Sequence, residues 1–160
     1  MKKRIFAFVI CLLCLITFSS CGYNHIMYEH LSNIENYETY TATIEKISVV
    51  KDGQALEYYE GTHTTKYIKG AVYLDISTEE ISYSIRVMIT EENSDILLEN
   101  GFYEIIKKGL TVEIQTSKWT YMDTPFNYVI GIKYDGTEYL NSQEGLENII
   151  EMMDADRSFF

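Results

Sequence analysis

The chain has 160 residues and a formal net charge of −11, from 13 Lys and Arg against 24 Asp and Glu. Nucleic acid and anionic lipid surfaces repel a body of this charge, because both are bound through Lys and Arg that neutralise phosphates. The length is sufficient for a single hydrophobic core of ordinary size, and the absence of repeats or interior linkers favours one domain.

Residues 1–20 are typical of an export signal. Lys2 to Arg4 precede an apolar run from Ile5 to Phe18, and Ser19 and Ser20 follow it. Export machinery reads this order of charge, apolar core and small residues. The run covers 14 residues, fewer than the roughly 18 that a transmembrane helix needs. An uncleaved anchor and plain secretion remain the alternatives.

The sequence Phe18-Ser19-Ser20-Cys21 resembles the lipobox of bacterial lipoproteins, with Phe where Leu is more common. The resemblance implies cleavage before Cys21 and a thioether between its thiol and diacylglycerol. Two acyl chains hold a protein far more firmly than one. We therefore expect a lipid-anchored protein, with the membrane as partner, on the extracytoplasmic face of the cell membrane. Residues 21–36 would be the lipidated cysteine and a tether.

The positions of the cysteines exclude several kinds of chemistry. The chain has three cysteines. Cys11 and Cys14 lie inside the apolar run, and Cys21 is the last, so the residues after it contain none. Thiolate zinc sites, disulfides and thiol catalysis are therefore excluded from the folded domain. Residues 1–20 hold three of the basic residues and none of the acidic ones, so their removal leaves a charge of −14.

Residues 37–160 are expected to form a single β-rich domain. Strands are predicted at 37–50, 66–76 and 81–89, because these segments are rich in β-branched and aromatic residues. The segment Ile81 to Ile89 alternates apolar and polar residues with the clearest period of two. Residues 54–65 read as a polar connection.

A helical region is predicted next. Thr90 or Ser94 would cap it, acidic residues occupy its first turn, Asn100-Gly101 would break it, and Lys107 to Gly109 would end it. Strands return at 110–116, 126–134 and 137–140. A C-terminal helix follows, with apolar residues at helical spacing, and we expect the tail 154–160 to fray. The spaced residues are Leu146, Ile149, Ile150 and Met153.

This order of elements indicates the α+β class. Three strands, a helix and two or three strands are the order of an OB-like small barrel, in which a helix covers the barrel end between the third and fourth strands. The alternative is a strongly curved antiparallel sheet with one inserted helix and a C-terminal helix.

The segment 117–126 holds the candidate binding residues Trp119, Tyr121 and Phe126, with the only Trp and the only Pro of the chain. In an OB-like barrel it would connect the fourth and fifth strands, a loop that such folds use for ligands. Exposed aromatic residues there would stack on sugars or anchor a protein partner. Alternatively, Trp119 and Phe126 fold inward and seal the barrel. His63 lies in a hydroxyl-rich loop and is a further binding candidate.

No catalytic motif, metal-ligand spacing or cofactor signature occurs in the sequence. We therefore expect a noncatalytic OB-like binding domain for a protein or glycan partner, with no cofactor, no metal and no nucleic acid. The alternative is a small envelope hydrolase that uses acidic residues, which requires two facing carboxylates about 5 to 10 Å apart.

The chain as a whole is similar to small lipoproteins of low-GC Gram-positive bacteria. The similarity rests on the signal, the composition and the residues 136–140 and 144–146 after a hairpin. It implies an envelope location and brings no known activity.

Overall fold

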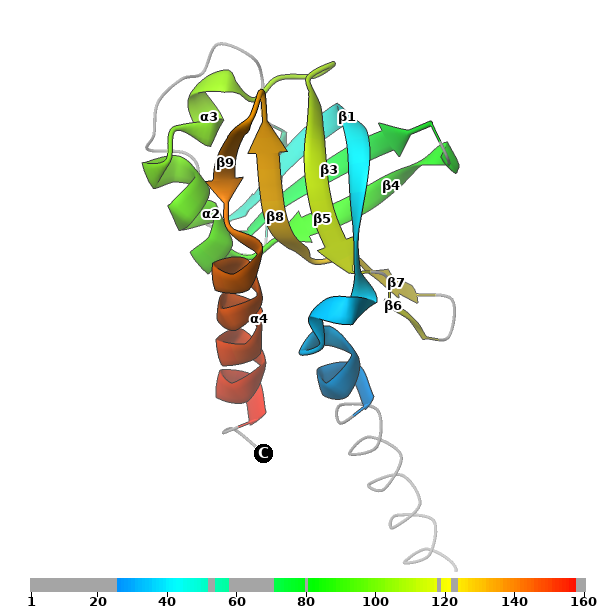
Figure 1. The fold of residues 1–160 in the computed structure, drawn as a ribbon, viewed down its shortest axis with the longest axis vertical. Coiled ribbons are helices and arrows are strands. Elements are labelled where there is room, and N and C mark those ends of the chain that lie inside the picture. Colours follow the sequence, from blue (N-terminus) through cyan, green and yellow to red (C-terminus); the bar gives the residue numbers. More distant parts are fainter. Residues whose placement is uncertain are drawn as a thin grey trace, which may run out of the picture.

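The computed structural model describes residues 26–51, 54–57, 71–79, 81–117, 119–121 and 124–157. They form a strand-rich α+β fold with an open antiparallel sheet (Figure 1). The elements are η1 (Ile34–Asn36), β1 (Tyr37–Lys51), β2 (Gln54–Glu57), β3 (Ala71–Thr78), β4 (Ile81–Ile89), α2 (Glu91–Glu99), α3 (Phe102–Ile105), β5 (Thr111–Ser117), β6 (Trp119–Tyr121), β7 (Thr124–Phe126), β8 (Val129–Tyr134), β9 (Thr137–Leu140) and α4 (Ser142–Arg157).

The long strand β1 belongs to both halves of the sheet. The strand order is β4-β3-β1-β5-β8-β9, and β2 pairs with the end of β1. The first part of β1 pairs with β5 and its later part with β3. The register shifts between Ile44 and Lys46, so that Glu45 is an extra residue. Such a bulge bends a strand and increases its twist. The sheet therefore curves around β1.

The strands β4 and β8 meet at one point. Met88 and Tyr128 form a parallel bridge, and the Met88 N–H donates to the Asn127 carbonyl at 2.7 Å. Elsewhere in the ranges given above, these two strands are not paired. The curved sheet thus brings its halves together at the start of β8 but does not close.

The main core lies between the concave side of the sheet and the helices α2 and α3. Alternate residues of each long strand point into it, as the period of two requires. Thr90 caps α2 by accepting a hydrogen bond from the Asn93 N–H at 3.3 Å. Leu97 and Phe102 then cover the end of the core. The fully buried strand residues include Ala42, Ile44, Val72, Leu74, Val87, Ile89 and Ile114.

A second apolar cluster lies beneath the sheet, where α4 packs beside the helical residues 26–31 (Figure 1). Leu31 and Ile149 are fully buried in it. The Tyr37 hydroxyl donates to the Leu31 carbonyl at 2.8 Å, and burial raises the pKa of this phenol. The described part of the segment expected to be a tether is therefore packed against the domain.

The helix α4 approaches β8 very closely. A Cβ on Gly145 would lie 2.1 Å from the Ile130 carbonyl oxygen, so only glycine fits there. The fully buried Asn93 spans the same contact. Its Nδ2 donates to the carbonyls of Val129 and Gly145, both at 3.1 Å, and its Oδ1 accepts from Asn148. One amide therefore joins α2, β8 and α4.

Comparison with the expected elements confirms the α+β class, the inserted helical region and the C-terminal helix. The Asn100-Gly101 break is also confirmed, because α2 ends before it and α3 begins after it. Three local expectations are wrong. The predicted connection 117–126 contains the paired strands β6 and β7, residues 54–57 form β2, and α4 continues to Arg157 where fraying was expected.

We expect Gly145→Ala to lower the free energy of unfolding by about 2 kcal/mol or more, because the added methyl group collides with backbone that cannot move aside. At an exposed helical position the same change would raise the free energy of unfolding by about 1 kcal/mol. The sign of the measured change therefore shows whether the close contact exists. Denaturant unfolding measures it. Glu151→Ala, at an exposed position of the same helix, is the control and should change stability by less than about 0.5 kcal/mol. A neutral Gly145→Ala would contradict the close contact.

Candidate functional site

The structure places three of the candidate residues in one two-stranded ribbon, β6–β7. Trp119 pairs with Phe126, and Tyr121 pairs with Thr124. Directly opposed positions and positions two apart share one face of an antiparallel ribbon. The register therefore puts the three aromatic positions on a common face. The ribbon extends from the lower end of the sheet in Figure 1. Cys21 and His63 lie outside the described residues.

The ribbon is attached to the body through the two residues that follow it. Asn127 is 6% exposed, and its Nδ2 donates to the Arg86 carbonyl of β4 at 3.1 Å. Tyr128 is bonded to β5, because its N–H donates to Ser117 Oγ and its carbonyl accepts from the Ser117 N–H. The ribbon therefore begins and ends at a fixed point between β4 and β5.

The outer face of β3 and β4 begins at this attachment point. We define the β3–β4 outer face by Tyr73, Asp75, Arg86 and Met88, which point away from the core. Tyr73 lies directly opposite Met88, and Asp75 lies directly opposite Arg86. Tyr73 and Met88 are both half-buried, so part of each side chain faces solvent. The face thus combines an aromatic and thioether pair with a charged pair.

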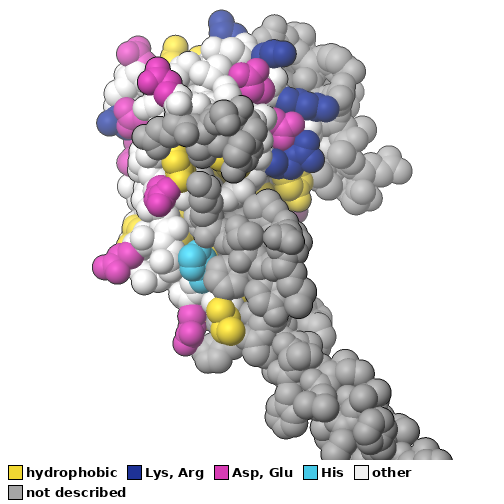
Figure 2. Space-filling model, turned by 90° about the vertical axis from the view of Figure 1, so that its right-hand side faces the viewer, with side chains coloured by type: hydrophobic (Ala, Val, Ile, Leu, Met, Phe, Trp, Pro, Cys, Tyr) yellow, Lys and Arg dark blue, Asp and Glu magenta, His cyan; other side chains and the backbone are white. Residues whose placement is uncertain are grey.

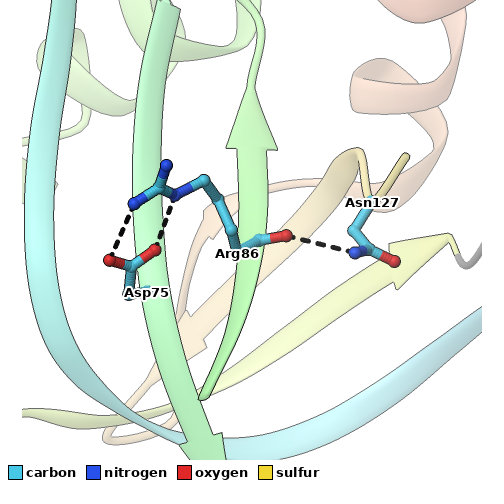
Figure 3. A network of polar contacts seen from close by, with 3 residues as sticks. All are labelled: Asp75, Arg86 and Asn127. Atoms are coloured by element: carbon cyan, nitrogen blue, oxygen red, sulfur yellow. Dashed lines mark hydrogen bonds and ion pairs between the residues drawn. The ribbon is translucent and has the colours of Figure 1, made fainter. Parts of the chain in front are cut away.

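Asp75 and Arg86 form a two-pronged ion pair (Figure 3). Arg86 Nε donates to Asp75 Oδ1 at 2.7 Å, and Nη2 donates to Oδ2 at 3.1 Å. The hydrogen bond and charge of Asp75 raise the pKa of Arg86 further. The side chain of Arg86 is 62% exposed and that of Asp75 is 20% exposed. The pair is therefore a bidentate polar group at the surface.

Acidic and basic side chains are distributed differently over the surface of the molecule. Figure 2 shows acidic side chains spread over the visible face, whereas Lys and Arg gather in its upper part. On the β3–β4 outer face the single acid and the single base neutralise each other. The neighbouring residues Glu45 and Lys46 of β1 likewise bring one charge of each sign. Among the described residues, the charges of this region therefore cancel, although the chain as a whole is strongly acidic.

A polar pocket of about 180 Å³ lies on a different part of the sheet, over β5, β8 and β9. Ser142 donates to Gln115 Oε1 across it, directly above Gly131. A Cβ on Gly131 would lie 2.6 Å from Ser142 Oγ. The other polar residues that line the pocket include Thr39, Glu113, Lys133 and Glu138.

The two carboxylates of this pocket have the environment of surface acids. Glu113 and Glu138 are both exposed. Glu113 faces Lys133 at 3.9 Å, and Glu138 accepts a hydrogen bond from Asn141. A general acid for glycoside hydrolysis needs a carboxyl that is shielded from water. The pocket therefore does not supply the arrangement that the hydrolase alternative requires.

No protein-family model, curated protein or solved structure matches the chain. In the described part of the chain, no three His, Cys, Asp or Glu residues gather as metal ligands would. No helix among those residues is both long and apolar enough to cross a membrane.

Sequence reasoning missed the β3–β4 outer face and Asn127. The alternation within Ile81 to Ile89 does place Arg86 and Met88 on the outward side. This alternation does not give the register between β3 and β4, which places Asp75 opposite Arg86 and Tyr73 opposite Met88. Asn127 carries no signal of its own, because its role depends on the folded position of β4.

We expect Asn127→Asp to destabilise the domain by about 2–4 kcal/mol at pH 7. The change replaces the donor facing the Arg86 carbonyl with a buried carboxylate oxygen. Burial raises the folded-state pKa of the new carboxyl above its unfolded value of about 3.9. The loss of unfolding free energy relative to the wild type should therefore become smaller toward pH 4, where the protonated carboxyl can again donate a hydrogen bond. Denaturant unfolding at both pH values tests this.

Asn100→Asp is the matched control for that prediction. The Asn100 amide also donates to a backbone carbonyl, that of Tyr139 at 2.9 Å, but at an exposed position. Loss of this exposed hydrogen bond should lower the free energy of unfolding by about 1 kcal/mol or less, with little dependence on pH. Equal effects of the two changes would contradict the buried role of Asn127.

Proposed function

We propose that this chain is a lipid-anchored extracytoplasmic lipoprotein of the cell membrane whose domain binds a protein or glycan partner without catalysis. The proposal rests on the lipobox-like residues before Cys21 and on one structural observation. The register of the ribbon β6–β7 puts the positions of Trp119, Tyr121 and Phe126 on a common face of that ribbon. Aromatic residues in such an array are typical anchors for sugars and proteins.

We further propose that the domain is an OB-like barrel. Three features support this assignment. The strand β1 pairs with both β3 and β5 across a bulge, α2 and α3 lie between β4 and β5, and β4 meets the start of β8 in a parallel bridge. The ribbon then corresponds to the loop between the last two barrel strands, which OB folds use for ligands.

The charge of the chain supports a partner other than nucleic acid or an anionic lipid surface. A charge of −14 after removal of residues 1–20 opposes both by repulsion. Attachment to the membrane would come from the acyl chains on Cys21 and not from the protein surface.

Cys21→Ala should abolish lipid attachment. Cells that express the wild-type chain should incorporate labelled palmitate into it and retain it in the membrane fraction until detergent is added. The variant should incorporate no label, because the thiol that would carry the diacylglycerol is absent. Equal labelling of the two chains would contradict the assignment.

Trp119→Ala should remove the partner from the domain. Chemical crosslinking in intact cells, followed by recovery of the chain, should give at least about tenfold less crosslinked partner than the wild type, since a buried aromatic anchor commonly contributes 2 kcal/mol or more.

Trp119→Phe is the conservative control for that experiment, because it keeps an aromatic ring at the same position. It should retain much of the crosslinking. Unchanged partners in Trp119→Ala would contradict the role of the ribbon, and equal losses in both variants would exclude a simple aromatic contact.

A further inference from the structure

We propose that the domain contacts the membrane directly, through the exposed side chains of Ile26 and Ile34. We define the anchor-proximal surface by these two residues, and its partner is the lipid bilayer that holds the acyl chains of Cys21. The inference rests on the proposed lipidation of Cys21 and goes beyond it. The acyl chains attach the protein to the membrane, whereas the anchor-proximal surface sets the orientation of the domain on it.

The segment that follows the lipidation site is folded onto the domain from residue 26. Leu31 is fully buried in the second apolar cluster. The Ser32 N–H donates to the Tyr28 carbonyl at 2.9 Å, and Asn36 Nδ2 donates to the His30 carbonyl at 2.8 Å. The helical residues 26–31 are therefore part of the body of the domain and do not act as a tether.

Only a short length of chain separates Cys21 from this body. Ile26 is five residues after Cys21, and five residues of fully extended chain span at most about 18 Å. The acyl chains lie inside the bilayer, so the thioether that carries them lies at the bilayer surface. The end of the domain that begins at Ile26 is therefore the end that lies next to the membrane.

This end carries exposed apolar side chains. Among the described residues, the large apolar side chains that are exposed are Ile26, at 54%, and Ile34, at 41%. A single exposed isoleucine is common on protein surfaces. Here both isoleucines belong to the segment nearest the lipid anchor, at five and thirteen residues after Cys21. Transfer of their side chains from water into the apolar part of the membrane interface is favourable.

The charges around the anchor-proximal surface select the kind of lipid. Glu29 and Glu35 are exposed in the same segment, and Glu147 and Glu151 are exposed on the neighbouring helix α4. Anionic headgroups repel these carboxylates. We therefore expect the contact to form on uncharged headgroups and to weaken as anionic lipid is added.

The contact depends on the short link to the anchor. A single myristoyl chain gives only marginal membrane binding, and two isoleucine side chains contain fewer apolar carbons than it does. The anchor-proximal surface therefore cannot hold an acidic domain on a membrane by itself. A short link keeps it at a high effective concentration near the bilayer.

The resulting orientation leaves the opposite end of the domain away from the membrane. The helical residues 26–31 and α4 lie at one end of the molecule, and the connection between α3 and β5 lies at the other (Figure 1). Lys108 belongs to that connection and is exposed. It marks the surface that should stay in water.

The test uses a single fluorescent label. No cysteine follows Cys21, whose own thiol is used by the lipid, so a new cysteine supplies the free thiol of the processed chain. Lipidated Ile34→Cys carries an environment-sensitive fluorophore and is reconstituted into phosphatidylcholine vesicles. Replacing these lipids with phosphatidylcholine brominated near the headgroup end of its chains should remove most of the fluorescence. Ile26→Cys should respond in the same way.

Lys108→Cys is the matched control, because its label should keep its fluorescence in the same vesicles. Insertion of about twenty Gly and Ser residues between Gly22 and Tyr23 should lower the effective concentration about tenfold and reduce the quenching at position 34. Addition of anionic phosphatidylglycerol should also reduce it. Thermal unfolding verifies that each labelled variant is folded.

Equal quenching at positions 34 and 108, or quenching at neither, overturns the inference. A label at position 34 that reports an apolar environment without quenching also overturns it, because a second copy of the chain or another protein then covers the surface. Unchanged quenching after the insertion contradicts the dependence on the short link. Incorporation of palmitate separates the two proposals. If Cys21 is lipidated and position 34 is not quenched, the inference alone fails, whereas a chain without lipid contradicts the proposed function as well.

Discussion

The rest of the structure depends on the short segment Asn127 to Ile130, where the chain leaves the ribbon and enters β8. Each of its residues contacts a different part of the fold. Asn127 bonds to β4, Tyr128 bonds to β5 and bridges to Met88, and the Val129 carbonyl accepts from Asn93 of α2. Ile130 is a bulge residue that points into the second apolar cluster, where Gly145 lets α4 pack directly on its backbone. Four consecutive residues thus join both halves of the sheet to two helices.

This segment also positions the ribbon relative to β4 and β5. The β3–β4 outer face is fixed by regular strand register, whereas the short ribbon is bonded to the body through the residues that flank it, Ser117, Asn127 and Tyr128. Because the Asn127 amide bonds to the backbone of Arg86, the same residue orients the ribbon and carries the ion pair of the face. Burial makes this contact valuable, since an unpaired buried amide or carbonyl costs about 1–3 kcal/mol. The polar pocket over β5, β8 and β9 lies apart from this arrangement.

The sequence predicted what depends on local pattern. The period of two in Ile81 to Ile89, the break at Asn100-Gly101 and the C-terminal helix each correspond to an observed feature. It did not predict the pairing of β6 with β7, because a polar and aromatic segment with one proline resembles an ordinary loop. The pairing of Asp75 with Arg86 and the place of Gly145 depend on register and helix packing between distant segments. Single residues carry no signal of such contacts.

The most direct test of the central role of this segment is native-state hydrogen exchange. The Met88 amide donates to Asn127, the Ser117 amide donates to Tyr128, and the Ile44 amide donates to Leu110 within the core sheet. If the start of β8 holds the fold together, the first two amides should exchange only through global unfolding, at the rate of the Ile44 amide. Exchange of Met88 and Ser117 about a hundredfold faster than Ile44 would mean that the junction opens by itself, and would contradict the account.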